Sequence, residues 1–271
     1  MTTTSTTPTI PPAPGSAGRH LPGLSAAATV ATKTFQQAQM LLGQTVDLNG
    51  IAAVSGKPGC GKTFAVDHFV RTHPSMHGRA WHWLDMPPKP TTKEVTVRLL
   101  DALGERRPRG ATEYELTELL DPALVRLNSV VVIDEAQNLK TDGLQQLRYL
   151  HDRGQSRSWA LLLVGSTVKE SLNGAAELDS RVSRWLTFKP LTDPDQLLRT
   201  LHGWHPVLAA TPADLLLRVD EVYARGNFRL WAQFLQTLLF LLGRRPAGTA
   251  VDNVLVGAAL AAVSPSTIRA R

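Results

Sequence analysis

One glycine-rich run of eight residues constrains the fold of this chain more than any other feature. It matches the pattern G-x-x-x-x-G-K-[ST] and consists of Gly56, Lys57, Pro58, Gly59, Cys60, Gly61, Lys62 and Thr63. The apolar residues 51–54 before it predict a buried strand, and residues 62–71 after it predict a helix. A strand, a glycine-rich turn and a helix in this order predict an α/β unit with a phosphate-binding loop.

The chemistry expected of this loop is the binding of ATP with Mg²⁺. Glycines allow successive backbone N–H groups to converge on phosphate oxygens, and the following helix presents its positive end. In this pattern Lys62 reaches the β- and γ-phosphates, and the Thr63 hydroxyl is a ligand of Mg²⁺. The alternative, a chance glycine-rich turn, does not explain the flanking strand and helix. Cys60 is either a tolerated small residue or a site of oxidative control of nucleotide binding.

The remaining pattern predicts a doubly wound α/β core followed by helices. Further short apolar runs alternate with helical patterns, which indicates a parallel sheet flanked by helices. The strands are expected at residues 80–84, 130–133, 160–164 and 185–188, and the helices at 92–103, 112–128 and 143–153. After residue 190 only helical patterns follow, at residues 193–201, 212–224, 228–242 and 252–263.

These patterns divide the chain into three expected parts. Residues 1–26 are expected to be a disordered Thr/Pro-rich tail, 27–190 a P-loop ATPase core and 191–271 a small all-helical lid domain. A first helix is expected over residues 25–42, with Gly43 as its C-terminal stop.

A second motif supports the first. Four β-branched apolar residues, 130–133, are followed directly by Asp134 and Glu135 at the expected carboxyl end of a strand, where open α/β sheets bind ligands. Asp134 fits the Walker-B role of holding Mg²⁺, and Glu135 fits the general base that polarises the attacking water. The alternative is a solvated strand end or a helix N-cap.

Three polar positions are candidates for sensing or completing the site. Ser166 follows the strand at 160–164 and is a candidate sensor-1 residue, although it could equally be a helix N-cap. Arg181, with Arg184 in reserve, could act in trans as an arginine finger, unless it forms a surface salt bridge with Glu177 or Asp179. Arg229, in the first turn of the helix at 228–242, is a candidate sensor 2 or else a solvated arginine.

The composition of the chain indicates its cellular compartment and the class of partner that it binds. The chain has 29 Lys and Arg against 23 Asp and Glu, a formal charge of +6, which favours a polyanion but also suits an arginine-rich genome. Cys60 is the only cysteine, which indicates a reducing, cytoplasmic setting. The tail has no signal-peptide pattern, and the most apolar later stretch, residues 231–243, is shorter than the roughly 18 residues of a membrane span. We therefore expect no membrane anchor.

Together these motifs resemble the AAA+ ATPases. The resemblance rests on the P-loop, residues 133–139, 164–166, 180–182 and 226–229, and covers approximately residues 31–242. Within AAA+, residues 86–91 and 144–152 resemble the DNA-transposition ATPases of the phage Mu B, TniB and IstB group. The chain differs from Mu B in having a Thr/Pro tail in place of an N-terminal helix-turn-helix.

The resemblance implies a regulator of DNA transposition. It implies that the ATP-bound protein assembles as a homo-oligomer, a ring or helical filament, on nonspecific duplex DNA and recruits or activates a transposase. The expected phosphate-backbone contacts are Lys89, Thr91, Thr92 and Lys93. The basic residues 106–109 are a second option, or a solvated turn.

Another class of function fits the same motifs. A nucleotide-switched signalling or defence AAA+ ATPase would act on protein partners and have no role at DNA. Secretion-linked ATPases share residues 134–137 but usually carry a membrane segment or a peptidoglycan-binding module, and neither is expected here.

Overall fold

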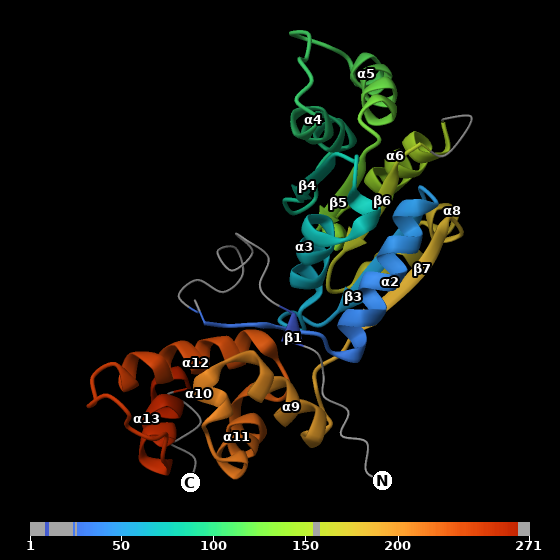
Figure 1. Cartoon of the computed structure of the whole chain (residues 1–271). Coiled ribbons are helices and arrows are strands. Elements are labelled where there is room, and N and C mark those ends of the chain that lie inside the picture. The colour runs from blue at the N-terminus through green and yellow to red at the C-terminus, as the bar shows by residue number, and fades with distance from the viewer. Residues whose placement is uncertain (1–8, 11–23, 25, 154–157, 265–271) are drawn as a thin grey trace, which may run out of the picture. The chain divides into compact units, whose positions relative to one another are not determined.

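The computed structural model describes residues 9–10, 24, 26–153 and 158–264 (Figure 1). Contacts within the chain divide it into two compact units. The sheet unit contains Gln37–Lys57 and Lys62–Phe188, and the helical unit contains Met1–Gln36, Pro58–Gly61 and Lys189–Arg271. The tip of the glycine-rich loop thus groups with the helical unit, while both of its flanks belong to the sheet unit.

The sheet unit is built on five parallel strands in the order β4-β5-β6-β3-β7 (Figure 1). The strands are β3 (Ile51–Gly56), β4 (Trp81–Asp85), β5 (Val130–Asp134), β6 (Ala160–Val164) and β7 (Val182–Phe188). Every residue of β5 and β6 is buried, as expected for parallel strands covered on both faces. The predicted parallel sheet is confirmed.

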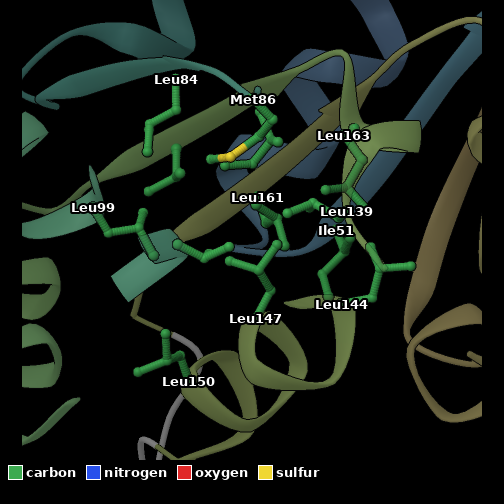
Figure 2. Packing of buried hydrophobic residues seen from close by; sticks show 14 of the residues in the cluster. Ile51, Leu84, Met86, Leu99, Leu139, Leu144, Leu147, Leu150, Leu161 and Leu163 are labelled. Carbon is green, nitrogen blue, oxygen red and sulfur yellow. The ribbon is translucent and has the colours of Figure 1, made fainter. Parts of the chain in front are cut away.

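Helices surround this sheet and complete its core. They are α3 (Lys62–Thr72), α4 (Thr92–Ala102), α5 (Glu113–Arg126), α6 (Thr141–Asp152), α7 (Val168–Asn173) and α8 (Ala176–Asp179), with short 3₁₀ turns η1 (Pro74–Met76) and η2 (Ala136–Asn138). Figure 2 shows Leu99 of α4 and Leu147 of α6 packed with Leu161 of β6. Burial of such side chains contributes about 1.5–3 kcal/mol each.

The first helix differs from the prediction at both ends. Helix α2 spans Lys33–Asp47, because Thr29–Val30 forms strand β2 and the Thr32 hydroxyl accepts a hydrogen bond from the Phe35 N–H at 3.2 Å. Gly43 does not stop the helix but lies inside it. A Cβ at Gly43 would lie 2.6 Å from the His73 ring, so the glycine is required for close packing.

The helical unit has its own core. Its helices are α9 (Pro194–Trp204), α10 (Pro206–Ala209), α11 (Ala213–Val219), α12 (Phe228–Leu242) and α13 (Asn253–Val263), and a π-helical turn η3 (Asp220–Ala224) follows α11. The rings of Trp231 and Phe234 meet edge to face in that core, with centroids 5.7 Å apart. The expected helix at 212–224 is therefore divided into α11 and η3.

Part of the segment expected as a tail has structure. Strand β1 (Thr9–Ile10) pairs antiparallel with β2 (Thr29–Val30). Residues 1–8, 11–23 and 25 lie outside the described residues. Among the helices that are described, none has the length and apolar character to cross a bilayer.

A half-buried histidine, His82, joins β4 to the helix that follows it. His82 Nδ1 lies 2.9 Å from the Ala102 carbonyl oxygen, and its Nε2 lies 3.3 Å from the Ser129 hydroxyl. Because a carbonyl only accepts, Nδ1 carries the proton and Nε2 accepts from Ser129. Burial lowers the pKa of His82, against a smaller opposing effect of the Ala102 hydrogen bond. The folded protein therefore favours the neutral ring.

This histidine predicts a loss of stability in acid. Below about pH 6.5 the unfolded chain takes up a proton that folded His82 resists, so stability falls as the pH drops, by at most about 1.4 kcal/mol per pH unit for this group. His82→Gln should reduce the fall in Tm between pH 7.5 and pH 5.5. The exposed His77 provides the control, since His77→Gln should leave that fall unchanged. An identical pH dependence in wild type and His82→Gln would contradict the assignment.

Candidate nucleotide site

The loop after β3 has a backbone that only glycine can adopt at its key positions. Gly56, Gly59 and Gly61 have φ values of +139°, +81° and +94°. A Cβ at Gly56 would lie 2.2 Å from the Phe188 carbonyl oxygen of the neighbouring strand β7. The loop therefore depends on these glycines both for its torsion angles and for its close approach to β7.

Lys62, the first residue of α3, is buried with 7% of its surface exposed. Its Nζ donates to the carbonyl oxygens of Gly56 at 2.5 Å and Lys57 at 3.0 Å. The ammonium group thus contacts the loop that is expected to bind the phosphates. Carbonyl oxygens are weaker hydrogen-bond partners for it than charged phosphate oxygens would be.

Asp134 ends β5 as a buried carboxylate, 7% exposed. Its Oδ1 accepts the Glu135 N–H at 2.9 Å, and the Thr63 side chain also hydrogen bonds to it. Burial raises the pKa of Asp134 most, the charges of Glu135 and Asp85 raise it further, and the two hydrogen bonds oppose these effects. A divalent cation at this carboxylate would offset the desolvation of its charge.

Asp85 is a site residue that sequence reasoning missed. It ends β4, and it pairs in register with Asp134 in the adjacent strand. The signal was an acidic residue at the end of an expected strand, but the sequence did not tell which strands are neighbours. Two carboxylates therefore lie side by side at the carboxyl edge of the sheet.

Glu135 projects from the turn after β5 and is exposed. Its backbone is left-handed, with φ 52° and ψ 39°. Its Oε2 accepts a hydrogen bond from Gln137 Nε2, and Gln137 Oε1 accepts the Ser166 N–H at 3.0 Å. Glu135 and Ser166 are thus joined through Gln137, which the sequence reasoning had not singled out as a site residue.

Ser166 lies immediately beyond β6, the strand next to β5. The N-cap of α7 is Thr167, so the alternative in which Ser166 caps that helix is wrong. The hydrogen bond that joins Ser166 to the Walker-B turn comes from its backbone N–H.

Known proteins resemble this chain over the region that contains these residues. Residues 46–170 match the family described as AAA domain. This match covers less than half of the chain. Over these residues the chain resembles AAA+ ATPases, transposition regulators among them. The match includes the P-loop, the Asp134–Glu135 pair and Ser166.

A curated relative is the Mu-like prophage FluMu DNA transposition protein B of Haemophilus influenzae. It is 26% identical over 144 residues, which cover 53% of this chain and 47% of that protein. The chain thus matches about half the length of this relative.

Solved structures share the AAA+ fold. Cdc6p from Pyrobaculum aerophilum is 21% identical with a TM-score of 0.66, and the match covers 86% of this chain and 65% of that one. The Aeropyrum pernix ORC1 protein, solved in complex with DNA, is 20% identical with a TM-score of 0.63, over 84% and 65% of the two chains. RuvB of Thermotoga maritima is 16% identical with a TM-score of 0.56, over 85% and 67%.

Within the helical unit, the start of α12 contacts the tip of the glycine-rich loop. Asn227 Nδ2 donates to the Pro58 carbonyl at 2.9 Å, and the Arg229 N–H donates to the Gly59 carbonyl at 3.4 Å. A Cβ at Gly59 would lie 2.1 Å from Asn227 Oδ1. Asn227 also caps α12, a role that its place before the helical pattern could have indicated. The Arg229 residue itself is exposed.

Neither candidate arginine finger pairs with Asp134 or Glu135 of its own chain. Arg181 precedes β7 and lies at the amino edge of the parallel sheet, whereas Asp134 ends β5 at the carboxyl edge. A five-residue strand such as β5 spans roughly 16 Å. Arg181 Nε pairs with Asp152 at 3.2 Å, not with Glu177 or Asp179. Arg184 Nε donates to Gln44 Oε1 at 3.2 Å.

The residues expected to contact DNA occupy the loop after β4 and the start of α4. Lys89 is exposed and left-handed, with φ 54°. Thr91 caps α4 by accepting the Glu94 N–H, and the Thr92 carbonyl accepts the Thr96 hydroxyl. Lys93 Nζ donates to the Ala111 carbonyl at 2.9 Å, so the loop between α4 and α5 returns to the start of α4.

That returning loop carries the second basic option. Arg107 pairs with Asp101 at 2.9 Å, while Arg106 and Arg109 are exposed. The two groups of basic residues thus lie at opposite ends of α4, one at its start and one in the loop that follows it.

The buried Asp134 predicts a trade-off between stability and function. Because the pKa of Asp134 is raised in the folded protein, ionisation of this carboxyl group destabilises the fold. The destabilisation is absent below the pKa of the unfolded chain and grows as the pH rises through the pKa of the folded protein. Asp134→Asn should therefore raise Tm at pH 7.5, by roughly 2–4 °C for each kcal/mol relieved, and abolish hydrolysis. At a pH near 3 the gain in Tm should disappear. A lower Tm at pH 7.5 would contradict this account.

Proposed function

We propose that this chain binds ATP with Mg²⁺ and hydrolyses it, and that this cycle regulates DNA transposition on duplex DNA. The observation that carries the proposal is the group of Thr63, Asp134 and Glu135 at the carboxyl edge of the sheet, beside the glycine-rich loop. In this proposal residues 27–190 act as the ATPase core and residues 191–271 as a lid.

The residues present fit Mg²⁺ and a triphosphate. Asp134 is a buried carboxylate hydrogen-bonded to a hydroxyl, and the described residues include no group of three or more His, Cys, Asp or Glu side chains that could hold a metal alone. Hard oxygen donors with phosphate oxygens completing the shell suit Mg²⁺. Thr63 and Asp134 would hold the ion, which when bound neutralises charge on the phosphates.

The protein's own groups would perform the remaining steps. The N–H groups of the loop, residues 56–63, would bind phosphate oxygens, and Lys62 would exchange its carbonyl partners for them. Glu135, exposed at the end of β5, would orient the attacking water and accept its proton. Ser166 and Arg229 would sense the nucleotide.

The comparisons and the charge of the chain support a role at DNA, and one relative supports a role in transposition. The Haemophilus relative is named a DNA transposition protein, and the structurally similar ORC1 protein of Aeropyrum was solved in complex with DNA. Lys and Arg outnumber Asp and Glu by 29 to 23, and Lys89, Arg106 and Arg109 are exposed. We propose nonspecific contacts to the DNA backbone from Lys89, Thr91, Thr92 and Lys93, and assembly in the cytoplasm as a homo-oligomer that recruits a transposase.

Steady-state ATP hydrolysis with and without duplex DNA tests this proposal. We expect DNA of unrelated sequences to stimulate turnover equally, and the stimulation to be lost as salt rises from about 50 to 200 mM, because phosphate contacts release counterions. Lys62→Ala provides the blank. Hydrolysis that does not respond to DNA, with no ATP-dependent retention on DNA, would favour a signalling or defence ATPase that acts on protein partners.

Mixing of two inactive variants tests the arginine finger. If Arg181 acts in trans, Arg181→Ala and Glu135→Gln should each be inactive alone and regain up to about one quarter of the activity when mixed, because only some interfaces combine an intact base with an intact arginine. Loss of the exposed Arg181–Asp152 pair should change stability by less than about 1 kcal/mol. Arg184→Ala is the matched control and should keep its activity. No recovery on mixing would remove Arg181 from this role.

A further inference from the structure

The side chain of Gln137 joins two strands at the carboxyl edge of the sheet. Gln137 lies in η2, the turn directly after Glu135. Its Nε2 donates to Glu135 Oε2, and its Oε1 accepts the Ser166 N–H at 3.0 Å, across 29 residues of sequence. The amide thus connects the turn after β5 with the segment after β6.

The orientation of the Gln137 side-chain amide is determined by its two hydrogen-bond partners. A backbone N–H can only donate, so the amide oxygen must face Ser166 and the NH₂ group must face Glu135. If the amide were rotated by a half turn, its NH₂ group would face the Ser166 N–H, which is also a donor. Its oxygen would then face the Glu135 carboxylate, which is also an acceptor. Gln137 is therefore a donor to one carboxylate oxygen of Glu135, and Oε1 of that carboxylate is left for another partner.

The surroundings leave space for this amide and hold its backbone. A Cβ at Gly165 would lie 1.9 Å from Gln137 Oε1 and 2.8 Å from Val168 Cγ2, so only glycine accommodates the bridge. On the other side of β5, Asn138 Nδ2 donates to the Met86 carbonyl at 2.7 Å, just beyond β4. The η2 turn is tied to both neighbours of β5.

Glu135 has few other restraints. It is exposed, and its backbone is in the left-handed conformation. An exposed glutamate loses side-chain rotamer freedom when it is held in one orientation, so the restraint must come from specific contacts. A hydrogen bond from a donor that is itself held can supply part of that restraint.

We propose that Gln137 is the positioning residue for the general base: it holds the Glu135 carboxylate so that its second oxygen faces the attacking water. The proposal rests on the proposed function, because it assumes that Glu135 is the base. Gln137 contacts neither substrate nor metal in this role and acts only through Glu135. Gly165 is required indirectly, because it makes room for the amide.

Three variants of the full-length chain test this role, with kcat, KM for ATP, nucleotide affinity and Tm measured for each. Gln137→Ala should lower kcat by about 10- to 100-fold with KM and affinity changed less than about threefold, because a misplaced catalytic group costs rate and not binding. Gly165→Ala should displace the amide and reproduce that fall in kcat. Gln145→Ala is the matched control and should have wild-type kcat, because Gln145 only accepts from Arg148 on α6.

Gln137→Glu separates positioning from a purely structural role. Its carboxylate can still accept the Ser166 N–H but cannot donate to Glu135 when ionised, and it places like charges together. The acid limb of the kcat–pH profile should therefore move to higher pH. An acid limb at the wild-type position, or a wild-type kcat in Gln137→Ala, would overturn the proposal. If Gln137→Ala unfolds, the pH profile of Gln137→Glu decides.

Glu135→Gln, measured in parallel, distinguishes the two levels of failure. If its turnover equals that of wild type, the base assignment fails and the inference fails with it. If its turnover is lost while Gln137→Ala hydrolyses ATP normally, only the role of Gln137 is overturned.

Discussion

The sheet unit places a charged carboxylate where water is largely excluded, and much of the local structure accommodates this constraint. Asp134 is 7% exposed, and burial raises its pKa. The Glu135 N–H and the Thr63 hydroxyl compensate in part, and both come from segments that begin where a strand ends. A buried charge with incomplete compensation is costly to folding. The arrangement is reasonable for a site whose ligand carries the missing positive charge.

Parallel pairing brings the other polar groups to the same edge. Asp85, Asp134 and Ser166 follow β4, β5 and β6, which are neighbours in the sheet. The same geometry removes Arg181 from the site, because it precedes β7 and lies at the opposite edge. The proposed role of this arginine in hydrolysis therefore requires a second copy of the chain.

The features that could be predicted from sequence are those that depend on local order. The strands, the glycine-rich loop and the Asp134–Glu135 pair follow from apolar runs and from motifs of eight residues or fewer. The first helix was misplaced, because the start of α2 depends on Thr32 and on the pairing of Thr29–Val30 with Thr9–Ile10. The sequence pattern predicts Gly43 as a helix stop, whereas in the structure it allows close packing against His73. The strand pairing before α2 and the contact with His73 are both tertiary, so the local pattern could not indicate them.

The site residues that were missed are those whose partners lie far away in sequence. Asp85 is separated from Asp134 by a pair of helices, α4 and α5, and only the order of the strands makes them neighbours. For Ser166 the hydroxyl suggested a role, but the observed link uses the backbone N–H. A backbone donor is present at every residue except proline, so no pattern of side chains could have indicated it.

The placement of Glu135 illustrates how this edge of the sheet differs from the core. Core side chains such as Leu147 and Leu161 are held by packing on all sides, and their positions tolerate few alternatives. Glu135 is exposed, so packing cannot orient it, and hydrogen bonds must do so instead. Because the donor, Gln137, is itself oriented by the segment after β6, a shift of that segment would be transmitted to the Glu135 carboxylate. If Glu135 is the base, as proposed, hydrolysis would then depend on the relation between two strands as well as on the presence of the carboxylate.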